Sequence, residues 1–128
     1  MRTPDTSTPV QIKTRPCASL ADAVLSTTHP DLFGSSDGNE AFARVKSRVR
    51  MTRYGGDCYG YCLLAAGFCD LIVEANLKTY DIAALIPIIE KAGGCITTWE
   101  GKPATEGGRI IAAGDPRVHE QAMAELAG

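Results

Sequence analysis

Apolar positions along the chain follow two spacings, one typical of buried strands and one typical of helices that cover a sheet. Short apolar runs predict strands at 22–27, 51–54, 70–74, 95–98 and 109–113. Apolar residues three and four apart predict helices at 40–50, 57–68 and 79–92, and Asp115-Pro116 begins a last one. Because strands and helices alternate, the expected fold class is α/β, a mixed sheet flanked by helices on both faces.

Two of the expected helices differ from an ordinary surface helix. Residues 57–68 are apolar nearly all round, which is typical of a buried helix, and Asp57 is placed to cap its start. Residues 79–92 contain Pro87, which predicts a kink whose cost is offset by packing. The pair 93–94, both glycine, predicts the end of this helix.

Length and composition limit the classes of protein. The 128 residues are enough for one domain, and residues 1–16, with three prolines and five serines or threonines, predict a flexible or extended polar leader before a domain at 17–128. Thirteen Lys and Arg against fifteen Asp and Glu exclude a strongly basic nucleic-acid binder. No run of 18 apolar residues exists, and the polar start does not resemble a signal peptide. We therefore expect a soluble, cytoplasmic protein.

Five cysteines allow two interpretations. Cys58 and Cys62 lie four residues apart, on one face of a helix, and Cys69 follows nearby, so a zinc site is conceivable. No Cys-x-x-Cys occurs, and His29 and His119 are distant in sequence. The alternative is a set of buried, reduced thiols in a cytosolic protein.

Carboxylates gather at the ends of the expected elements. Glu74 ends an apolar strand and Asp81 begins an apolar helix, and these ends meet at one rim of an α/β sheet. Two carboxylates there suit a divalent cation or a polyhydroxyl substrate. The alternative is that Asp81 only complements the helix dipole.

A glycine pair precedes the helix at 57–68. Gly55 and Gly56 allow a ligand to approach the backbone, and Asp57 favours a cation or a hydroxyl donor, unless it serves only as the N-cap. Residues 44–53 hold five basic residues and no acidic one, which indicates either a solvated face or an anion site. Arg53 is the candidate within this run because it lies just before the glycine pair.

Residues 53–94 resemble the C-terminal half of the inositol monophosphatase family of metal-dependent phosphatases. The resemblance is carried by Leu77-Lys78-Thr79-Tyr80-Asp81-Ile82-Ala83-Ala84 and by Glu90-Lys91-Ala92-Gly93-Gly94. Family members usually have Trp-Asp where this chain has Tyr80-Asp81, and the likeness extends from about Pro16 to the C-terminus. It implies the C-terminal lobe of the sugar-phosphatase fold.

The resemblance also assigns roles. Asp81 matches a ligand of Mg²⁺, Glu74 matches a residue that contacts the non-phosphate part of the substrate, and Gly55, Gly56 and Asp57 match the loop that lines the same pocket. Tyr54-Gly55-Gly56-Asp57-Cys58-Tyr59 is most similar to the histidinol-phosphatase branch. An added carboxylate suits histidinol phosphate, which carries an ammonium group, better than an inositol or sugar phosphate, which remains the alternative substrate.

The family's upstream metal ligands, a glutamate and an Asp-Pro-x-Asp-Gly-Thr segment, have no counterpart in this sequence. We therefore expect the chain to be the second half of the enzyme, truncated and inactive by itself. Its expected partners are a small phosphorylated substrate and either the missing N-terminal half or another copy of the chain, with no nucleic acid and no membrane. A non-catalytic fragment or assembly module is the remaining alternative.

Overall fold

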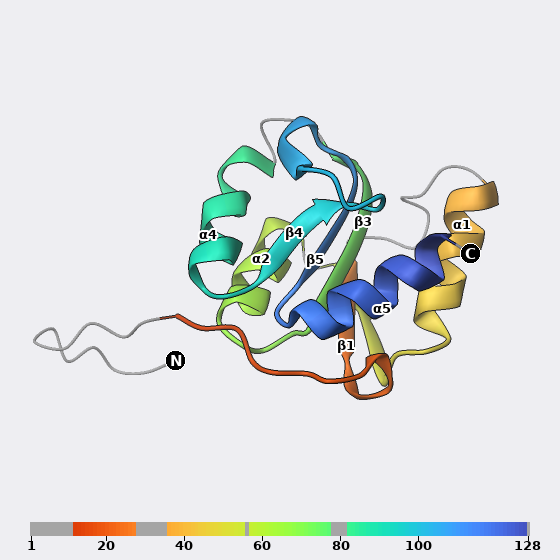
Figure 1. Ribbon diagram of the computed structural model, residues 1–128, viewed down its shortest axis with the longest axis horizontal. Helices are drawn as coiled ribbons and strands as arrows, with labels where there is room; N and C mark the ends of the chain where they lie inside the picture. The colour runs from red at the N-terminus through yellow and green to blue at the C-terminus, as the bar shows by residue number, and fades with distance from the viewer. Residues whose placement is uncertain (1–11, 28–35, 56, 78–81, 128) are drawn as a thin grey trace, which may run out of the picture.

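The computed structural model describes residues 12–27, 36–55, 57–77 and 82–127. A five-stranded sheet in the order β2-β1-β3-β5-β4 lies between two layers of helices (Figure 1). In chain order the elements are β1 (Val24–Thr27), α1 (Ser36–Lys46), β2 (Met51–Tyr54), α2 (Asp57–Ala65), β3 (Leu71–Leu77), α4 (Leu85–Lys91), β4 (Cys95–Thr98), β5 (Gly108–Ala113) and α5 (Pro116–Ala127). Two short 3₁₀ turns, Leu20–Asp22 and Ala104–Glu106, were not expected from the sequence.

The sheet is mixed, which confirms the predicted fold class. Strand β1 pairs in parallel with both β2 and β3, whereas β5 runs antiparallel to β3 and β4. All five predicted strands are present, and those at 51–54 and 95–98 have the predicted limits. The strand expected at 70–74 continues to Leu77, with an irregular register against β5 after Glu74.

Each face of the sheet has its own apolar core. Helices α1 and α5 cover one face, where Val73 and Ile111 pack against Phe42 and Val118. Helices α2 and α4 cover the other face, where Ile72, Ile110 and Ala112 pack against buried residues of those helices and of the segment before α4, namely Tyr61, Leu64, Ile82, Leu85 and Ile89. The central strands are therefore apolar on both sides, which is why they appear in the sequence as unbroken apolar runs.

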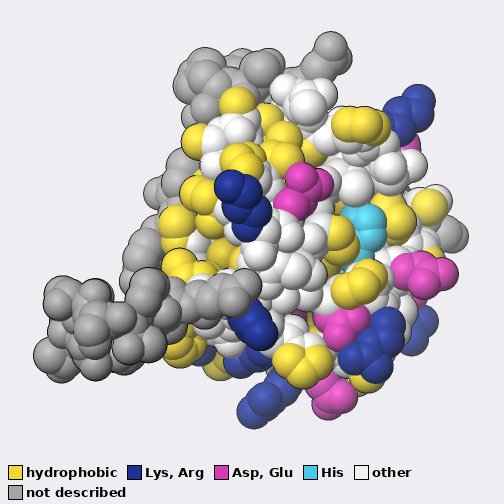
Figure 2. All heavy atoms as spheres, turned by 60° about the vertical axis from the view of Figure 1, so that its left-hand side comes forward, with side chains coloured by type: hydrophobic (Ala, Val, Ile, Leu, Met, Phe, Trp, Pro, Cys, Tyr) yellow, Lys and Arg dark blue, Asp and Glu magenta, His cyan; other side chains and the backbone are white. Residues whose placement is uncertain are grey.

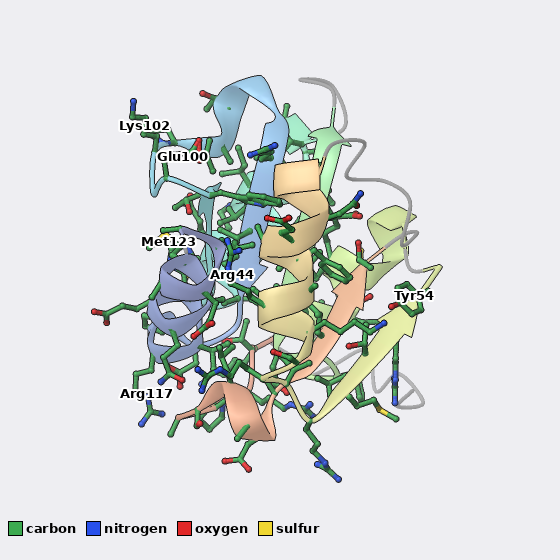
Figure 3. The ribbon with its side chains drawn as sticks, turned by 90° about the vertical axis from the view of Figure 1, so that its right-hand side faces the viewer. Arg44, Tyr54, Glu100, Lys102, Arg117 and Met123 are labelled. Atoms are coloured by element: carbon green, nitrogen blue, oxygen red, sulfur yellow. The ribbon has the colours of Figure 1, made fainter. Side chains whose placement is uncertain are left out.

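Hydrogen bonds join helix α1 to the C-terminal end of helix α5. Arg44 points from α1 towards α5 (Figure 3), and its guanidinium donates to the carbonyl oxygens of Glu125 and Leu126 at 2.7 and 3.2 Å. These carbonyls belong to the last turn of α5, whose carbonyl groups have no partner within the helix. Arg44 thus serves as a C-cap and is not part of an anion site.

The helix predicted at 79–92 is interrupted in the structure, because Ile82 and Ala83 are helical and the chain then turns at Ala84. α4 begins at Leu85, after a turn at Ala84, and residues 78–81 lie outside the described part of the chain. Pro87 then falls in the first turn of α4, where a backbone N–H has no partner within the helix. The break at Ala84 lies within one turn before Pro87, so the expected disruption of the helix by Pro87 is present.

The start of the chain is bonded to the fold from Thr14 onward. The amide of Thr14 donates to the carbonyl oxygen of Ala92 at 3.0 Å, and the amide of Cys17 donates to Asp115 at 3.0 Å. Residues 12–16 have no regular secondary structure, and the bond of Thr14 ties this segment to the end of α4. Residues 1–11 lie outside the described residues, and the domain boundary at residue 17 stays a prediction.

Candidate functional site

Three parallel strands end at the same edge of the sheet. In the order β2-β1-β3, their carboxyl ends are marked by Tyr54, Thr27 and the segment of β3 from Glu74. α2 also begins at this edge, because Asp57 follows β2 after two residues. In open α/β sheets, ligands bind outside the carboxyl ends of the strands, so this edge is the candidate site.

A buried carboxylate lies at this edge. Glu74 is only 2% exposed, and the Thr27 hydroxyl donates a hydrogen bond of 3.2 Å to its Oε2. A carboxylate removed from water is destabilising unless it is hydrogen-bonded, so Thr27 helps to hold Glu74 in place. Sequence reasoning singled out Glu74 but missed Thr27, the last residue of the strand predicted at 22–27.

Gly55 connects the ends of β1 and β2. Its backbone has a φ of +86°, in the left-handed region that favours glycine, and its amide donates to the carbonyl oxygen of Thr27 at 3.1 Å. Apart from its chain neighbours, no described residue has a heavy atom within 4 Å of where a Cβ on Gly55 would stand, so these residues leave the backbone open to approach. Thr27, Gly55 and Glu74 are called the edge cluster below.

The structure describes only some of the other predicted site residues. Arg53 lies on β2, exposed, and paired in register with Ser26. Asp57 is the first residue of α2, and its side chain is not described, so its role as the N-cap stays a prediction. Gly56 and Asp81 lie outside the described residues, so the assignment of Asp81 as a metal ligand stays a prediction.

The described residues do not by themselves fit a magnesium ion. Mg²⁺ requires about six oxygen ligands in octahedral geometry, including carboxylates. Among the residues that the structure describes, no group of three or more His, Cys, Asp or Glu side chains is arranged to hold a metal. Glu74 contributes one carboxylate at the edge, already bonded to Thr27. We therefore assign no catalytic step to a metal here.

The same finding argues against zinc. Cys17 and Cys69 are buried, Cys62 is exposed, and burial raises the pKa of Cys95 to about 11, which keeps that thiol protonated. His119 is buried too, which lowers its pKa, and its Nε2 lies 2.8 Å from the Thr97 hydroxyl. Reduced thiols are the better interpretation for these four cysteines, although Cys62 is not buried. The side chain of Cys58 lies outside the described residues.

Replacing Thr27 by valine tests the edge cluster. Valine keeps the shape of threonine but removes the hydroxyl that donates to Glu74, so we expect the free energy of unfolding to fall by about 1–2 kcal/mol. Urea unfolding monitored by circular dichroism measures the change. Ser26→Ala is the matched control, because Ser26 precedes Thr27 on β1 and its side chain points to the α2 side of the sheet, towards Gly60. Equal losses in the two variants would contradict the role of Thr27.

Known proteins similar to this chain share one family. A model of the inositol monophosphatase family matches residues 6–128. The bifunctional phosphatase IMPL2 of Arabidopsis thaliana is 45% identical over 124 residues, covering 90% of this chain and 36% of the relative. A histidinol-phosphatase of Streptomyces coelicolor is 34% identical, covering 91% of this chain and 41% of the relative.

A solved inositol monophosphatase from Zymomonas mobilis superposes with a TM-score of 0.86 at 44% identity, covering 91% of this chain and 47% of that one. This chain thus spans about half the length, or less, of the relatives it matches. No helix among the described residues is long and apolar enough to cross a membrane. With a family match over nearly its whole length and the fold of a solved member, the chain belongs to the inositol monophosphatase family.

Proposed function

We propose that this chain is the C-terminal part of a metal-dependent phosphomonoesterase that hydrolyses histidinol phosphate to histidinol and phosphate. The observation that supports it most directly is the buried, hydrogen-bonded Glu74 at the carboxyl edge, beside the open backbone of Gly55 and the start of α2. Such an edge can bind the part of a substrate that carries hydroxyl or ammonium groups.

The substrate assignment follows from charge. Glu74 and Asp57 both belong to this edge, and histidinol phosphate carries an ammonium group that an inositol phosphate lacks. A hydrogen bond between a carboxylate and an ammonium group is worth about 1.5–3 kcal/mol. Relatives named as histidinol-phosphatases, including the Streptomyces coelicolor protein, support this assignment. The Zymomonas mobilis inositol monophosphatase keeps an inositol phosphate as the second candidate substrate.

Within this proposal the residues have separate tasks. Glu74 and Asp57 bind the polar end of the substrate, Gly55 and Gly56 line the same pocket, and Arg53 lies near them on β2. Asp81 is the proposed ligand of Mg²⁺. The four described cysteines are free thiols, which favours a reducing compartment such as the cytoplasm.

The test is a complemented enzyme. The half of the Zymomonas mobilis enzyme that this chain does not span is fused ahead of it, and phosphate release is measured with Mg²⁺ on histidinol phosphate and inositol phosphate. We expect histidinol phosphate to be preferred in kcat/KM, and the 128-residue chain by itself to release no phosphate. Asp57→Ala should lower kcat/KM for histidinol phosphate about tenfold or more, the scale of one charged hydrogen bond, and leave inositol phosphate unchanged.

Two results would contradict parts of the proposal. Equal losses on both substrates after Asp57→Ala would remove the argument for histidinol phosphate. Asp81→Asn is expected to lower activity at least about tenfold and to raise the Mg²⁺ concentration required, as loss of a charged ligand should. Unaltered activity in that variant would rule out Asp81 as a metal ligand.

A further inference from the structure

Thr27 is the central residue of the edge cluster. It ends β1, the strand that lies between β2 and β3 in the sheet (Figure 1). Its carbonyl oxygen accepts a hydrogen bond of 3.1 Å from the amide of Gly55, just after β2, and its hydroxyl donates a bond of 3.2 Å to Glu74 on β3. The backbone and the side chain of one residue therefore join the two sides of the proposed pocket.

Strand pairing does not hold Glu74 to β1. Among the described residues, the last pair that joins β1 and β3 is Ser26 with Ile72, two residues before Glu74. On its other side Glu74 pairs with Ile110 of β5, but the register between these strands becomes irregular after it. The Thr27 hydroxyl thus connects Glu74 to β1 at a point where the regular ladder has ended.

This bond restricts the direction in which the Glu74 carboxylate faces. A glutamate side chain has several rotatable bonds, and fixing them costs conformational entropy. Both Glu74 and Thr27 are buried, so little water competes for the bond between them. An ionised carboxylate only accepts hydrogen bonds, and the Thr27 hydroxyl approaches its Oε2.

Selectivity for a cationic substrate depends on the placement of single carboxylates. On the side of the molecule that Figure 2 shows, acidic side chains are scattered, and most lie near Lys or Arg side chains. No large acidic patch is visible among the described side chains on that side, so that surface would not concentrate ammonium compounds. A charged hydrogen bond requires a short distance between donor and acceptor, so an accurately placed carboxylate can discriminate where a diffuse field does not.

We propose that Thr27 is a positioning residue of this phosphatase, whose hydroxyl directs the Glu74 carboxylate towards the polar end of the substrate. The inference rests on the proposed function, in which Glu74 binds the ammonium or hydroxyl groups of the substrate. Thr27 acts through Glu74 and does not touch the substrate. The hydroxyl carries this role rather than the shape of the side chain, so serine should replace threonine and valine should not.

Kinetics of the complemented enzyme distinguish this role from a structural one. Thr27→Val removes the bond to Glu74 but keeps the carbonyl group that binds Gly55. We expect KM for histidinol phosphate to rise about fivefold, the scale of one hydrogen bond, and kcat to change less than about twofold. Phenyl phosphate has no ammonium or alcohol group, so its KM and kcat should not change. A partly unfolded enzyme would lose activity on both substrates equally.

Two single variants serve as controls. Thr27→Ser keeps a hydroxyl at the same position, so KM for histidinol phosphate should return to within about twofold of the original value. Thr52→Val makes the same change of side chain on the neighbouring strand β2, and it should leave the kinetics on both substrates unaltered.

A double variant tests whether Thr27 acts through Glu74. Glu74→Leu removes the acceptor and keeps a side chain of similar size, and it should lower kcat/KM for histidinol phosphate about tenfold. Adding Thr27→Val to Glu74→Leu should then cause no further loss beyond about twofold, because the hydroxyl no longer has this carboxylate to direct. Losses that multiply in the double variant would overturn the proposal.

The isolated chain gives a readout that needs no activity. The chemical shift of the ¹³C-labelled carboxyl carbon of Glu74, assigned by its loss in Glu74→Leu, depends on the hydrogen bonds that the carboxylate accepts. We expect this signal to move in Thr27→Val, to return in Thr27→Ser and to stay unchanged in Thr52→Val. An unmoved signal in Thr27→Val would overturn the proposal.

The kinetic outcomes also separate this inference from the proposed function. An active complemented enzyme in which Thr27→Val leaves KM unchanged, or impairs both substrates equally, would contradict the positioning role alone. A complemented enzyme that releases no phosphate from any substrate would contradict the proposed function, and the positioning role with it.

Discussion

Replacing Arg15 by methionine is expected to lower the free energy of unfolding by about 3 kcal/mol. The guanidinium of Arg15 donates to both carboxylate oxygens of Asp70, each at 2.7 Å, and the amide of Val24 donates to the same carboxylate at 2.8 Å. Asp70 is 2% exposed, so the change would leave a buried charge without its counter-ion. The expected loss is at the lower end for a broken buried pair because the Arg15 side chain is 41% exposed.

Urea unfolding at neutral pH measures the loss, and two further variants identify its cause. Arg48→Met breaks an exposed pair with Glu125, whose closest atoms are 3.7 Å apart, and should cost no more than about 0.5 kcal/mol. Asp70→Asn added to Arg15→Met removes the buried charge and should restore part of the stability. The explanation would be wrong if Arg48→Met cost as much as Arg15→Met.

This ion pair could not have been predicted from the sequence. Arg15 and Asp70 are 55 residues apart, and nothing in the local pattern around either residue indicates the other. Asp70 was interpreted as a charge that ends a strand, and Arg15 as part of a flexible leader. Periodicity predicts which residues turn towards a core, but not which distant residue satisfies a buried charge.

The strands were predictable because their signal is local. A strand buried on both faces must be apolar at nearly every position, and β3 and β5 have this pattern in the sequence. The start of α4 was not predictable in the same way. Helical spacing extends from residue 79 to 92, but the chain turns at Ala84, so that Pro87 falls where its missing N–H matters least.

The candidate site was predictable only where a residue gives a local signal in the sequence. Glu74 is a charge at the end of an apolar run, which stands out in a sequence, and it lies at the predicted edge. Thr27 is common in strands and carries no such signal, so its bond to Glu74 became visible only when β1 and β3 were placed side by side. The prediction that 57–68 is a buried helix holds only in part, because α2 ends at Ala65 and both Cys62 and Phe68 are exposed.

Gly94→Ala is expected to lower the free energy of unfolding by about 2–3 kcal/mol. The sequence suggested that Gly93 and Gly94 serve one purpose, the end of a helix, but the structure separates them. Gly93 has a φ of +101°, so it needs its conformational freedom. A Cβ on Gly94 would lie 2.7 Å from the backbone oxygen of Ala113 and 3.0 Å from a methyl group of Ile89. Because Ala113 is fully buried and paired on both sides in the sheet, its carbonyl cannot move away without disturbing the packing.

A matched glycine separates steric exclusion from backbone strain. Gly108 has a φ of +88° with no heavy atom within 4 Å of an added Cβ, so Gly108→Ala introduces strain alone and should cost about 1 kcal/mol. Urea midpoints of both variants, compared at an unchanged m-value, give the two losses. A loss in Gly94→Ala no larger than that in Gly108→Ala would mean that β5 yields to the methyl group. The close approach of residue 94 to β5 would then not be what requires glycine in the Ala-Gly-Gly motif of this family.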